Sequence, residues 1–386
     1  MRVLEGIVEL APVYGERGLS IVSGLGKFVW DAEGRRYLDF HTGHGAAFLG
    51  HKNPEVISRL REVLDSGVIA VGAAFSSPWR EEAAKALSRI TPGRWVMYML
   101  NTGTEAVELA LKIAVKATGR SKIVAFKGGF HGRTLGSLSA TWNPAYRGPF
   151  TRHGYPVAFA PYNDPYSLDK YVDEDTAAII VETVQGEGGI IPGSREFLHA
   201  VRKEASRAGA LFVVDEVQTG FGRTGCTWSW ECLGVEPDIF TAGKSIGGGF
   251  PVSVVMVKPE FNALSKSEYG STHGGNPLAS AAIVGGVEAL IKDDVPSKAA
   301  RMGRVFEEVL RERLEGHRLI REIRVKGLMV GVELRRPPTP YLKCLQSRRI
   351  LALKAGATVV RFLPPYLIDE DDVGGAVESL EACLSA

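Results

Sequence analysis

The sequence is poor in several kinds of residue, and each shortage excludes a class of protein. Only four cysteines occur among 386 residues, and their spacing matches no metal-binding motif. We therefore expect reduced thiols, with neither a disulfide framework nor a metal site. No apolar run approaches the roughly 18 residues of a membrane helix, and the opening segment carries Glu5 and Glu9 where a signal peptide would be apolar. These features predict a cytoplasmic protein with no membrane partner.

The sequence also lacks a large excess of either positive or negative charge. Lysine and arginine total 46 and aspartate and glutamate 44, so the net charge is +2, and the two signs are interspersed. This balance argues against a nucleic-acid partner. Asparagine and glutamine total nine, a depletion that is a tendency of thermophilic proteins. The hydrophobic content of 45% is typical of a globular protein, and the length favours a large domain plus a smaller one.

Short apolar runs alternate with helical patterns, which favours an α/β fold with a mostly parallel sheet. Helices are expected over residues 104–119, where apolar residues recur on one face, and over 194–209. The strand candidates are residues 95–100, 122–126, 177–182, 210–216, 238–243 and 252–257.

The pattern changes after residue 276. Two long helical stretches, 276–293 and 297–317, precede strand-like residues in 320–335 and 357–365. This part reads as a smaller α+β domain. Near the other end of the chain, residues 28–40 predict a tight hairpin, which we place beside that smaller domain.

Three features lie where predicted strands end, which is where open α/β sheets bind ligands. Gly103 and Thr104 open a helix whose free N–H groups suit a phosphate, although Thr104 could be an ordinary N-cap and the segment lacks the Walker A signature. Asp215 ends the apolar run "LFVVD", but could equally form a surface ion pair. Lys244 lies in "TAGKSIGGGF" with no acid within five residues, and is either a desolvated reactive amine or a surface lysine.

Together these features suggest a cofactor that has a phosphate, a basic ring nitrogen and an aldehyde. Pyridoxal phosphate has all three. A lysine takes its aldehyde, an aspartate pairs with the pyridine nitrogen and a helix N-terminus holds its phosphate.

Longer motifs then point to a family. These are "FVWDAEGRRYLDF", "LGHKNPEV", "NTGTEAVELALK", "FHGRTLGSLSAT", "VETVQGEGGI", "DEVQTGFGRTG", "EPDIFTAGKSIGGGFP", "STHGGNPLAS" and "VVRFLPP". Over nearly its whole length the chain resembles the class-III, fold-type-I pyridoxal-phosphate aminotransferases. It is most similar to acetylornithine and ornithine aminotransferases, and above all to the archaeal and thermophilic members that act on an amino-group carrier protein in lysine and arginine biosynthesis.

The resemblance implies an organisation of the chain. A large domain at 46–276 would hold the cofactor on a mostly parallel seven-stranded sheet. The C-terminal small α+β domain would span 277–386, and the N-terminal segment 1–45 would pack with it.

The resemblance also implies roles around the cofactor ring. Lys244 would bind the aldehyde and move the proton during catalysis, and Asp215 would keep the pyridine nitrogen protonated. Phe130 and Val217 would lie against the two ring faces, and Gln218 would reach the ring hydroxyl. Without the resemblance, Phe130 would be interpreted as a core aromatic residue and Val217 would carry no signal.

The phosphate would be held by Gly103 and Thr104 and, from the partner subunit, by Thr272. That last role implies a homodimer or a dimer of dimers. By itself Thr272 could be a turn residue.

For substrates, Arg133 matches a carboxylate-binding arginine of the family, and its planar fork suits that task. Arg361 matches the arginine that binds the α-carboxylate of glutamate. Glu187 matches the acid that pairs with this arginine when an ω-amine substrate is bound, and Glu182 matches another active-site acid. The alternatives are a structural ion pair for Arg361 and a glycine-rich turn for Glu187.

The sequence departs from the family's usual pattern at Val107, Thr183 and His273, and places His44 near the expected mouth of the pocket. These departures leave the substrate open but not the reaction. We expect an ω-aminotransferase that moves an amino group between glutamate/2-oxoglutarate and the terminal semialdehyde of an acetylated or carrier-linked amino acid. An acidic carrier would need a basic entrance.

Three alternatives remain at this stage. One is ornithine or 4-aminobutyrate transamination, and another is an aminomutase reaction, which would need no second amino acid. A nucleotide-binding α/β module that takes up no pyridoxal phosphate is the alternative from another class of protein.

Overall fold

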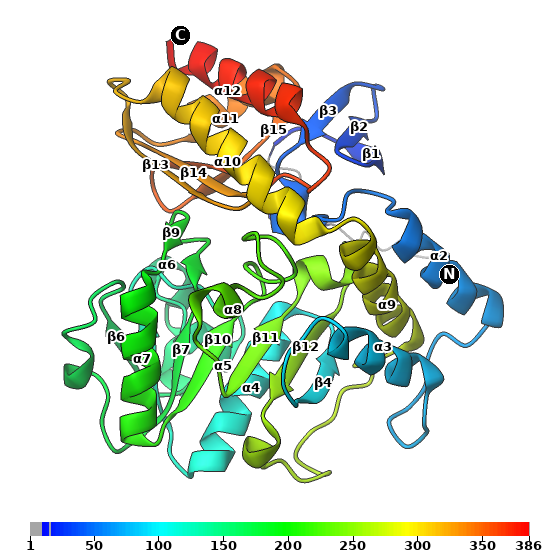
Figure 1. Ribbon diagram of the computed structural model, residues 1–386, viewed down its shortest axis with the longest axis vertical. Coiled ribbons are helices and arrows are strands. Elements are labelled where there is room, and N and C mark those ends of the chain that lie inside the picture. Colours follow the sequence, from blue (N-terminus) through cyan, green and yellow to red (C-terminus); the bar gives the residue numbers. More distant parts are fainter. Residues whose placement is uncertain (1–9, 15–16, 386) are drawn as a thin grey trace, which may run out of the picture.

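A computed structural model describes residues 10–14 and 17–385 of the chain. Figure 1 shows a part built on a large sheet and, next to it, a part in which a smaller sheet carries the C-terminal helices. The large sheet has seven strands, which lie in the order β4 (Val96–Leu100), β12 (Ser253–Val257), β11 (Ile239–Ala242), β10 (Leu211–Asp215), β7 (Thr176–Val181), β5 (Lys122–Phe126) and β6 (Val157–Ala160).

This sheet is parallel except for β12, which runs antiparallel to both of its neighbours. All six residues of β7 and all five of β10 are buried, as expected of parallel strands covered on both faces by helices. Each fully buried aliphatic side chain contributes about 1.5–3 kcal/mol. The predicted fold class is therefore confirmed, and each of the six predicted strands is present; β6 was not predicted.

Helix α4 (Gly103–Thr118) follows β4 and has sequence signals at both ends. Thr102 caps its N-terminus in a reciprocal pair with Glu105, and Gly119 ends it with a φ of 69°. Its buried face is Ala106, Val107, Leu109, Ala110, Leu111, Ile113 and Ala114. Helix α7 (Arg195–Ala208) packs on β10 and β7, so the two helices predicted in this region are confirmed.

Other helices surround this core. Helix α9 (Pro277–Lys292) packs against α2 (Pro54–Ser66) and α3 (Pro78–Ser88). The short elements are α1 (Thr42–Gly45), α5 (Leu135–Ser139), α6 (Pro144–Arg147), α8 (Ser229–Leu233), the hairpin β8 (Val184–Gln185) and β9 (Ile191–Pro192), and the 3-10 turns η1 (Phe150–His153), η2 (Leu168–Lys170), η3 (Lys244–Gly247) and η4 (Pro259–Phe261).

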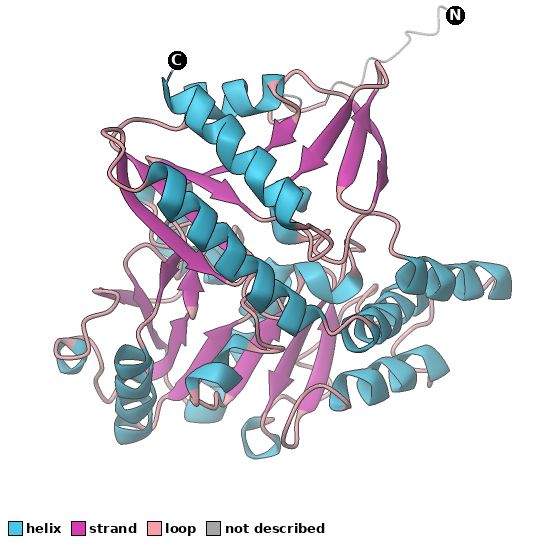
Figure 2. Cartoon of the chain, turned by 45° about the horizontal axis from the view of Figure 1, so that its top comes forward, coloured by secondary structure: helices cyan, strands magenta, loops and turns pink. Residues whose placement is uncertain are grey.

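The smaller part has a four-stranded antiparallel sheet, in the order β13 (Ile320–Lys326), β14 (Met329–Leu334), β17 (Val359–Phe362) and β16 (Leu353–Ala355). Its helices are α10 (Val295–Leu314), α11 (Thr339–Ser347) and α12 (Glu370–Ser385). Figure 2 shows helices of this part lying along one face of its strands.

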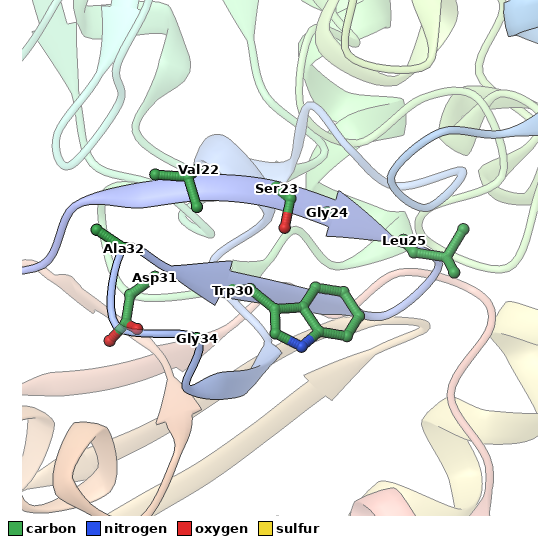
Figure 3. Close-up of a pocket in the computed structure, with 8 residues that line it drawn as sticks. All are labelled: Val22, Ser23, Gly24, Leu25, Trp30, Asp31, Ala32 and Gly34. Carbon is green, nitrogen blue, oxygen red and sulfur yellow. The ribbon is translucent and has the colours of Figure 1, made fainter.

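The N-terminal strands join this smaller part through one pairing. Strands β1 (Ile21–Leu25), β2 (Phe28–Asp31) and β3 (Arg36–Asp39) form a meander, and β3 pairs in parallel with β15 (Ile350–Leu351). The hairpin predicted over 28–40 corresponds to β2 and β3. A surface hollow of about 520 Å³ lies beside β1 and β2. Figure 3 shows residues that line it, among them Trp30. Residues 1–9, 15 and 16 of the predicted N-terminal segment lie outside the described residues, and the domain limits remain a prediction.

The prediction of reduced cysteines is wrong. Cys226 and Cys232 form one disulfide, with Cα atoms 6.3 Å apart, and Cys344 and Cys383 form another, with Cα atoms 5.8 Å apart. The second links α11 to α12, which pack together although their cysteines are 39 residues apart. Spacing in the sequence carried no sign of this packing, so the number and positions of the cysteines could not predict either pairing.

The described residues lack two kinds of feature. None of the helices there combines the length and apolar character needed to span a bilayer. Nor do histidine, cysteine, aspartate and glutamate side chains there gather in a group that could hold a metal ion.

Candidate active site

The candidate site lies where β10 and β11 end. Asp215 is the last residue of β10, and its register partner on β11 is Thr241. Lys244 follows β11 after Gly243 and has a φ of 49°, in the left-handed region. Such backbone strain in a residue other than glycine tends to occur at functional sites. Parallel strand pairing therefore brings together an aspartate and a lysine that are distant in sequence.

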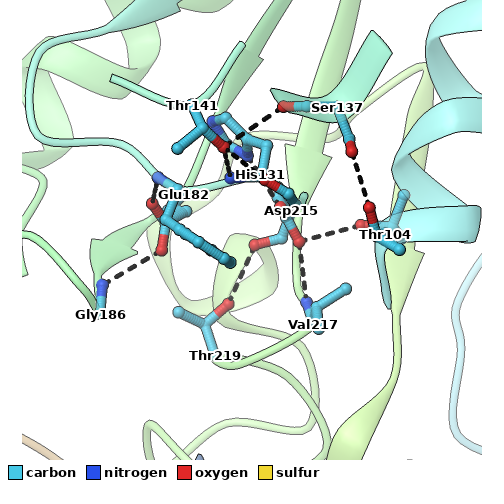
Figure 4. Close-up of polar contacts among 12 residues, drawn as sticks. Thr104, His131, Ser137, Thr141, Glu182, Gly186, Asp215, Val217 and Thr219 are labelled. Atoms are coloured by element: carbon cyan, nitrogen blue, oxygen red, sulfur yellow. Dashed lines mark hydrogen bonds and ion pairs between the residues drawn. The ribbon is translucent and has the colours of Figure 1, made fainter. Parts of the chain in front are cut away.

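The Asp215 carboxylate is fixed by three donors. Its Oδ1 accepts a hydrogen bond from Thr241 Oγ1 at 3.0 Å. Oδ1 also accepts one from the Val217 backbone N–H at 3.1 Å, and Oδ2 lies 2.8 Å from His131 Nδ1 (Figure 4). Only 5% of Asp215 is exposed. Burial alone would lower the pKa of His131, but the hydrogen bond and charge of Asp215 outweigh burial and raise it.

Sequence reasoning missed His131. Its signal was the histidine of "FHGRT", directly after Phe130. Nothing in that motif shows that the ring turns inward to Asp215, because 84 residues separate the two.

The amine of Lys244 has no hydrogen-bond or ion-pair partner among the described residues. Burial lowers its pKa from the usual range, the positive charge of Arg361 lowers it further, and the charges of Asp215 and Glu187 oppose this. The neutral amine, which is the nucleophilic form, is thereby favoured.

Glu182 connects two loops of the site. Its Oε1 accepts the Phe130 N–H at 2.9 Å and its Oε2 accepts the Gly186 N–H at 3.1 Å. Burial raises its pKa to about 7. Glu182 therefore holds the backbone of the loop that carries Phe130 and of the turn that carries Glu187.

The N-terminus of α4 forms another wall. Thr104 Oγ1 lies 2.7 Å from Ser137 Oγ and accepts the Arg133 N–H at 3.1 Å. A Cβ on Gly103 would come within 2.6 Å of Val217, so glycine allows these two segments to approach. The first N–H groups of a helix have no partner within it, which leaves an anion-binding end at this position.

Arg361, on β17, faces the site from the smaller part of the molecule. It is fully buried, and its Nη2 donates to Glu187 Oε1 at 2.7 Å, while Nη1 lies 3.4 Å from Gln218 Oε1. Burial would raise the pKa of Glu187, but the charge and hydrogen bond of Arg361 lower it instead. The Arg361 Nε is buried without a partner among the described residues, so one donor is left for a ligand.

Two predicted residues lie apart from this cluster. Arg133 is exposed, and its guanidinium stacks 3.8 Å from the ring centre of Tyr146 and 5.5 Å from that of Phe130. Thr272 is exposed and lines a different hollow, which it shares with Thr134.

Cavities open outward from the cluster. One of about 280 Å³ is lined by residues that include Phe130, Tyr146, Glu187 and Lys354. Lys354 also lines a wider pocket of about 730 Å³, which we call the basic pocket. Its charged lining residues are Arg17, Arg35, Lys343, Arg349 and Lys354, with His41 and His44, and no aspartate or glutamate is among the described residues that line it.

Lys244 and Asp215 lie at neighbouring strand ends of an α/β fold, faced by the Arg361–Glu187 pair, and together they form one polar site. The chain belongs to the aminotransferase class-III family, whose pattern matches residues 12–384. The resemblance drawn from the motifs is therefore confirmed, and with it the prediction of an aminotransferase.

Relatives of known sequence and structure agree with this assignment. The LysW-aminoadipate semialdehyde/glutamate semialdehyde transaminase of Sulfurisphaera tokodaii is 51% identical, over 94% of this chain and 93% of its own. The acetylornithine aminotransferase of Archaeoglobus fulgidus is 40% identical, over 95% of each chain. Among solved structures, the ornithine aminotransferase of Toxoplasma gondii ME49 has a TM-score of 0.91 at 30% identity, covering 95% of this chain and 90% of that one.

Proposed function

We propose that the protein is a pyridoxal-phosphate-dependent ω-aminotransferase of lysine or arginine biosynthesis. It would move an amino group between glutamate/2-oxoglutarate and the terminal semialdehyde of a carrier-linked amino acid. The observation that carries the proposal is the Glu187–Arg361 pair beside the unpaired Lys244 amine, because it lets one pocket accept two kinds of substrate.

The residues present fit this cofactor. Lys244 offers a desolvated amine that none of the described residues pairs with, and Asp215 offers a fixed negative charge near it. Gly103 and Thr104 offer a helix N-terminus for the phosphate, with Val217 between these groups. When bound, pyridoxal phosphate would supply an aldehyde that captures amines and a ring that accepts electrons.

The chain's own groups would do the rest. Lys244 Nζ would accept and return the substrate's proton, and burial lowers the pKa of this amine in the direction that a base requires. His131 and Thr241 would keep Asp215 aligned with the ring nitrogen, and Phe130 and Val217 would cover the ring faces. Gln218, 3.4 Å from Arg361, would link the ring hydroxyl to the substrate side.

Arg361 and Glu187 would select between substrates. For glutamate, Glu187 would withdraw and the α-carboxylate would take its place on Arg361, using Nη2 and the spare Nε donor. For an ω-amine substrate, Glu187 would stay and neutralise Arg361. Arg133 would bind a second carboxylate at the open side.

The basic pocket supports an acidic carrier protein as the partner. Among the described residues, the guanidinium of Arg17 donates only to neutral oxygens, those of Gln346, Ala352 and Leu342. Lys354 connects this pocket with the cavity beside Glu187. A negatively charged segment could therefore run from the pocket toward Lys244, with its potential complementary to the wall.

A second copy of the chain would complete the site. Thr272 is exposed, and by the family's pattern it would reach the phosphate of the partner subunit. The proposed assembly is a homodimer or a dimer of dimers.

Spectroscopy and kinetics test the proposal together. Purified protein supplied with pyridoxal phosphate should absorb visible light, and the spectrum should change on adding glutamate. Assays should then compare carrier-linked, acetylated and free ornithine with 4-aminobutyrate. Activity on 4-aminobutyrate alone would contradict the substrate assignment, and a protein that takes up no pyridoxal phosphate would contradict the reaction.

Charge reversal tests the carrier. Lys343→Glu, in the basic pocket, should raise KM for the carrier-linked substrate about tenfold without affecting acetylornithine. Arg348→Glu is the matched control, because Arg348 is also exposed near the end of α11 but does not line the pocket. Equal effects of the two changes would argue against docking in this pocket.

A further inference from the structure

The turn that carries Glu187 rests on the smaller sheet. We call residues 186–190, between β8 and β9, the Glu187 turn. The Gly356 N–H donates to the Glu187 carbonyl oxygen at 2.9 Å. Within the turn, Gly189 has a φ of 120° and Ile190 a φ of 57°, so its backbone is held in an unusual shape.

Three residues of the sheet lie in one row beneath this turn. Arg324 on β13 pairs in register with Gly331 on β14, and Gly331 pairs in register with Arg361 on β17. Side chains directly opposite each other on adjacent strands point to the same face of a sheet. Two arginines therefore flank a glycine on the face that meets the turn.

Each arginine holds a different part of the turn. Arg324 Nε donates to the Gly189 carbonyl oxygen at 3.0 Å, and Arg361 Nη2 donates to the Glu187 carboxylate at 2.7 Å. One contact fixes the backbone, and the other is the pair that a substrate carboxylate would replace.

Gly331 leaves the space that the turn occupies. A Cβ at this position would lie 3.0 Å from both the Gly189 carbonyl oxygen and the Ile190 Cβ. That is tighter than ordinary contact, so a side chain would push the turn away from the sheet.

Arg324 does not compete with Arg361 for the carboxylate of Glu187. Its Nη1 donates to Glu333 at 2.7 Å and also pairs with Glu322, and only 9% of its side chain is exposed. Its charge is balanced on its own sheet, so what it offers the turn is one directed donor.

We propose that Arg324 and Gly331 are positioning residues that set the strength of the Glu187–Arg361 pair, and through it the balance between the enzyme's two kinds of substrate. The inference rests on the proposed function. While the turn is held, Glu187 has a fixed place to return to. When the turn is loose, Glu187 pairs with Arg361 less of the time. The α-carboxylate of glutamate then competes less with Glu187 for Arg361, whereas an ω-amine substrate binds beside an arginine whose charge is not neutralised.

The test uses Arg324→Met and Gly331→Ala in the full chain loaded with pyridoxal phosphate. Arg321→Met is the matched control, because Arg321 lies on the same strand and pairs with Glu333 but has a side chain that is 68% exposed. Within the described part of the chain, Arg321 makes no hydrogen bond or ion pair to the turn. The ratio of the single-turnover rates with glutamate and with N2-acetylornithine should shift toward glutamate by about tenfold in the two variants. This is the size expected for loss of one charge-assisted hydrogen bond. Arg324→Lys should restore part of the wild-type ratio.

Hydrogen–deuterium exchange of residues 186–190 gives a readout independent of activity. Exchange should quicken in Arg324→Met and Gly331→Ala and stay unchanged in Arg321→Met. Unchanged exchange, or equal losses in both half-reactions, would overturn the inference. A wild-type enzyme inactive in both half-reactions would instead overturn the proposed function, while exchange would still decide whether Arg324 holds the turn.

Discussion

The two sides of the pocket hold their charges in different ways. On the strand-end side, the carboxylate of Asp215 has three donors and is almost fully buried. On the Arg361 side, the Glu187 side chain is 26% exposed and pairs with one arginine. The buried Nε of that arginine has no partner in the described part of the chain. The Asp215 carboxylate is therefore held by three donors, whereas the Glu187–Arg361 pair can exchange its bonds.

This difference matches what each side would bind. A permanent cofactor favours groups that are fixed before it arrives, because preorganised charges need no rearrangement during reaction. Two alternating substrates require a pair that can open and close. We infer that residues on the strand-end side hold the cofactor and transfer the proton, and that residues on the Arg361 side determine which substrate binds.

The largest effect is expected from removing the amine on the fixed side. Lys244→Ala should lower turnover by about 10⁴-fold, because a positioned proton carrier typically contributes 10²–10⁴-fold and the attachment point is lost as well. Absorption spectra and turnover with glutamate would measure this. Loss of turnover with an unchanged visible spectrum would contradict Lys244 as the attachment point.

Breaking either disulfide should lower stability and leave the ratio of the two half-reactions unchanged. Loop-closure entropy gives about 4 kcal/mol for the 39-residue span of Cys344–Cys383 and about 2 kcal/mol for the 6-residue span of Cys226–Cys232. Denaturant unfolding of Cys344→Ser and Cys226→Ser should therefore rank in that order. An altered half-reaction ratio in Cys344→Ser would show that the Arg361 side depends on the whole smaller domain.

A buried acid behind the fixed side should make stability depend on pH. Burial raises the pKa of Glu216 from 4.5 to about 7, although Ser229 and Thr219 donate hydrogen bonds to it. The protonated form is favoured in the folded state, so this contribution is complete below about pH 4.5 and is lost as the pH rises through 7.

The matched variant is Glu216→Gln, which keeps the shape of the side chain. Between pH 5 and pH 8 the wild type should lose on the order of 3 kcal/mol more unfolding free energy than this variant. Glu182, whose pKa is also raised to about 7, is present in both proteins and cancels in the difference. Parallel pH profiles of the two proteins would contradict a neutral Glu216 in the fold.

The sequence pattern predicted those elements whose structure is set by residues close together in the sequence. The apolar runs gave six strands of the large sheet, and the N-cap and stop signals gave α4 to within a residue or two. Strand β6, "VAFA", was missed because it is short and its first three residues are only partly buried. Asp215 and Lys244 could be predicted because both follow apolar strands.

What could not be predicted depends on contacts between distant segments. His131 contacts Asp215, Arg324 donates to Gly189, and Cys344 is bonded to Cys383. In each pair the two residues lie at least 39 residues apart in the sequence. Sequence spacing carries no record of these approaches. Only the register of β13, β14 and β17 places Arg324 and Arg361 on either side of Gly331.

The most direct measurement of the contrast between the two sides is the half-reaction ratio of Glu187→Gln, measured by single turnovers with glutamate and with N2-acetylornithine. A neutral glutamine cannot pair with Arg361 as a charge does, so the ratio should move toward glutamate by about tenfold, while the visible spectrum of the resting enzyme stays the same. An unchanged ratio, or a changed resting spectrum, would contradict the account, because Glu187 would then not be the exchangeable partner of Arg361.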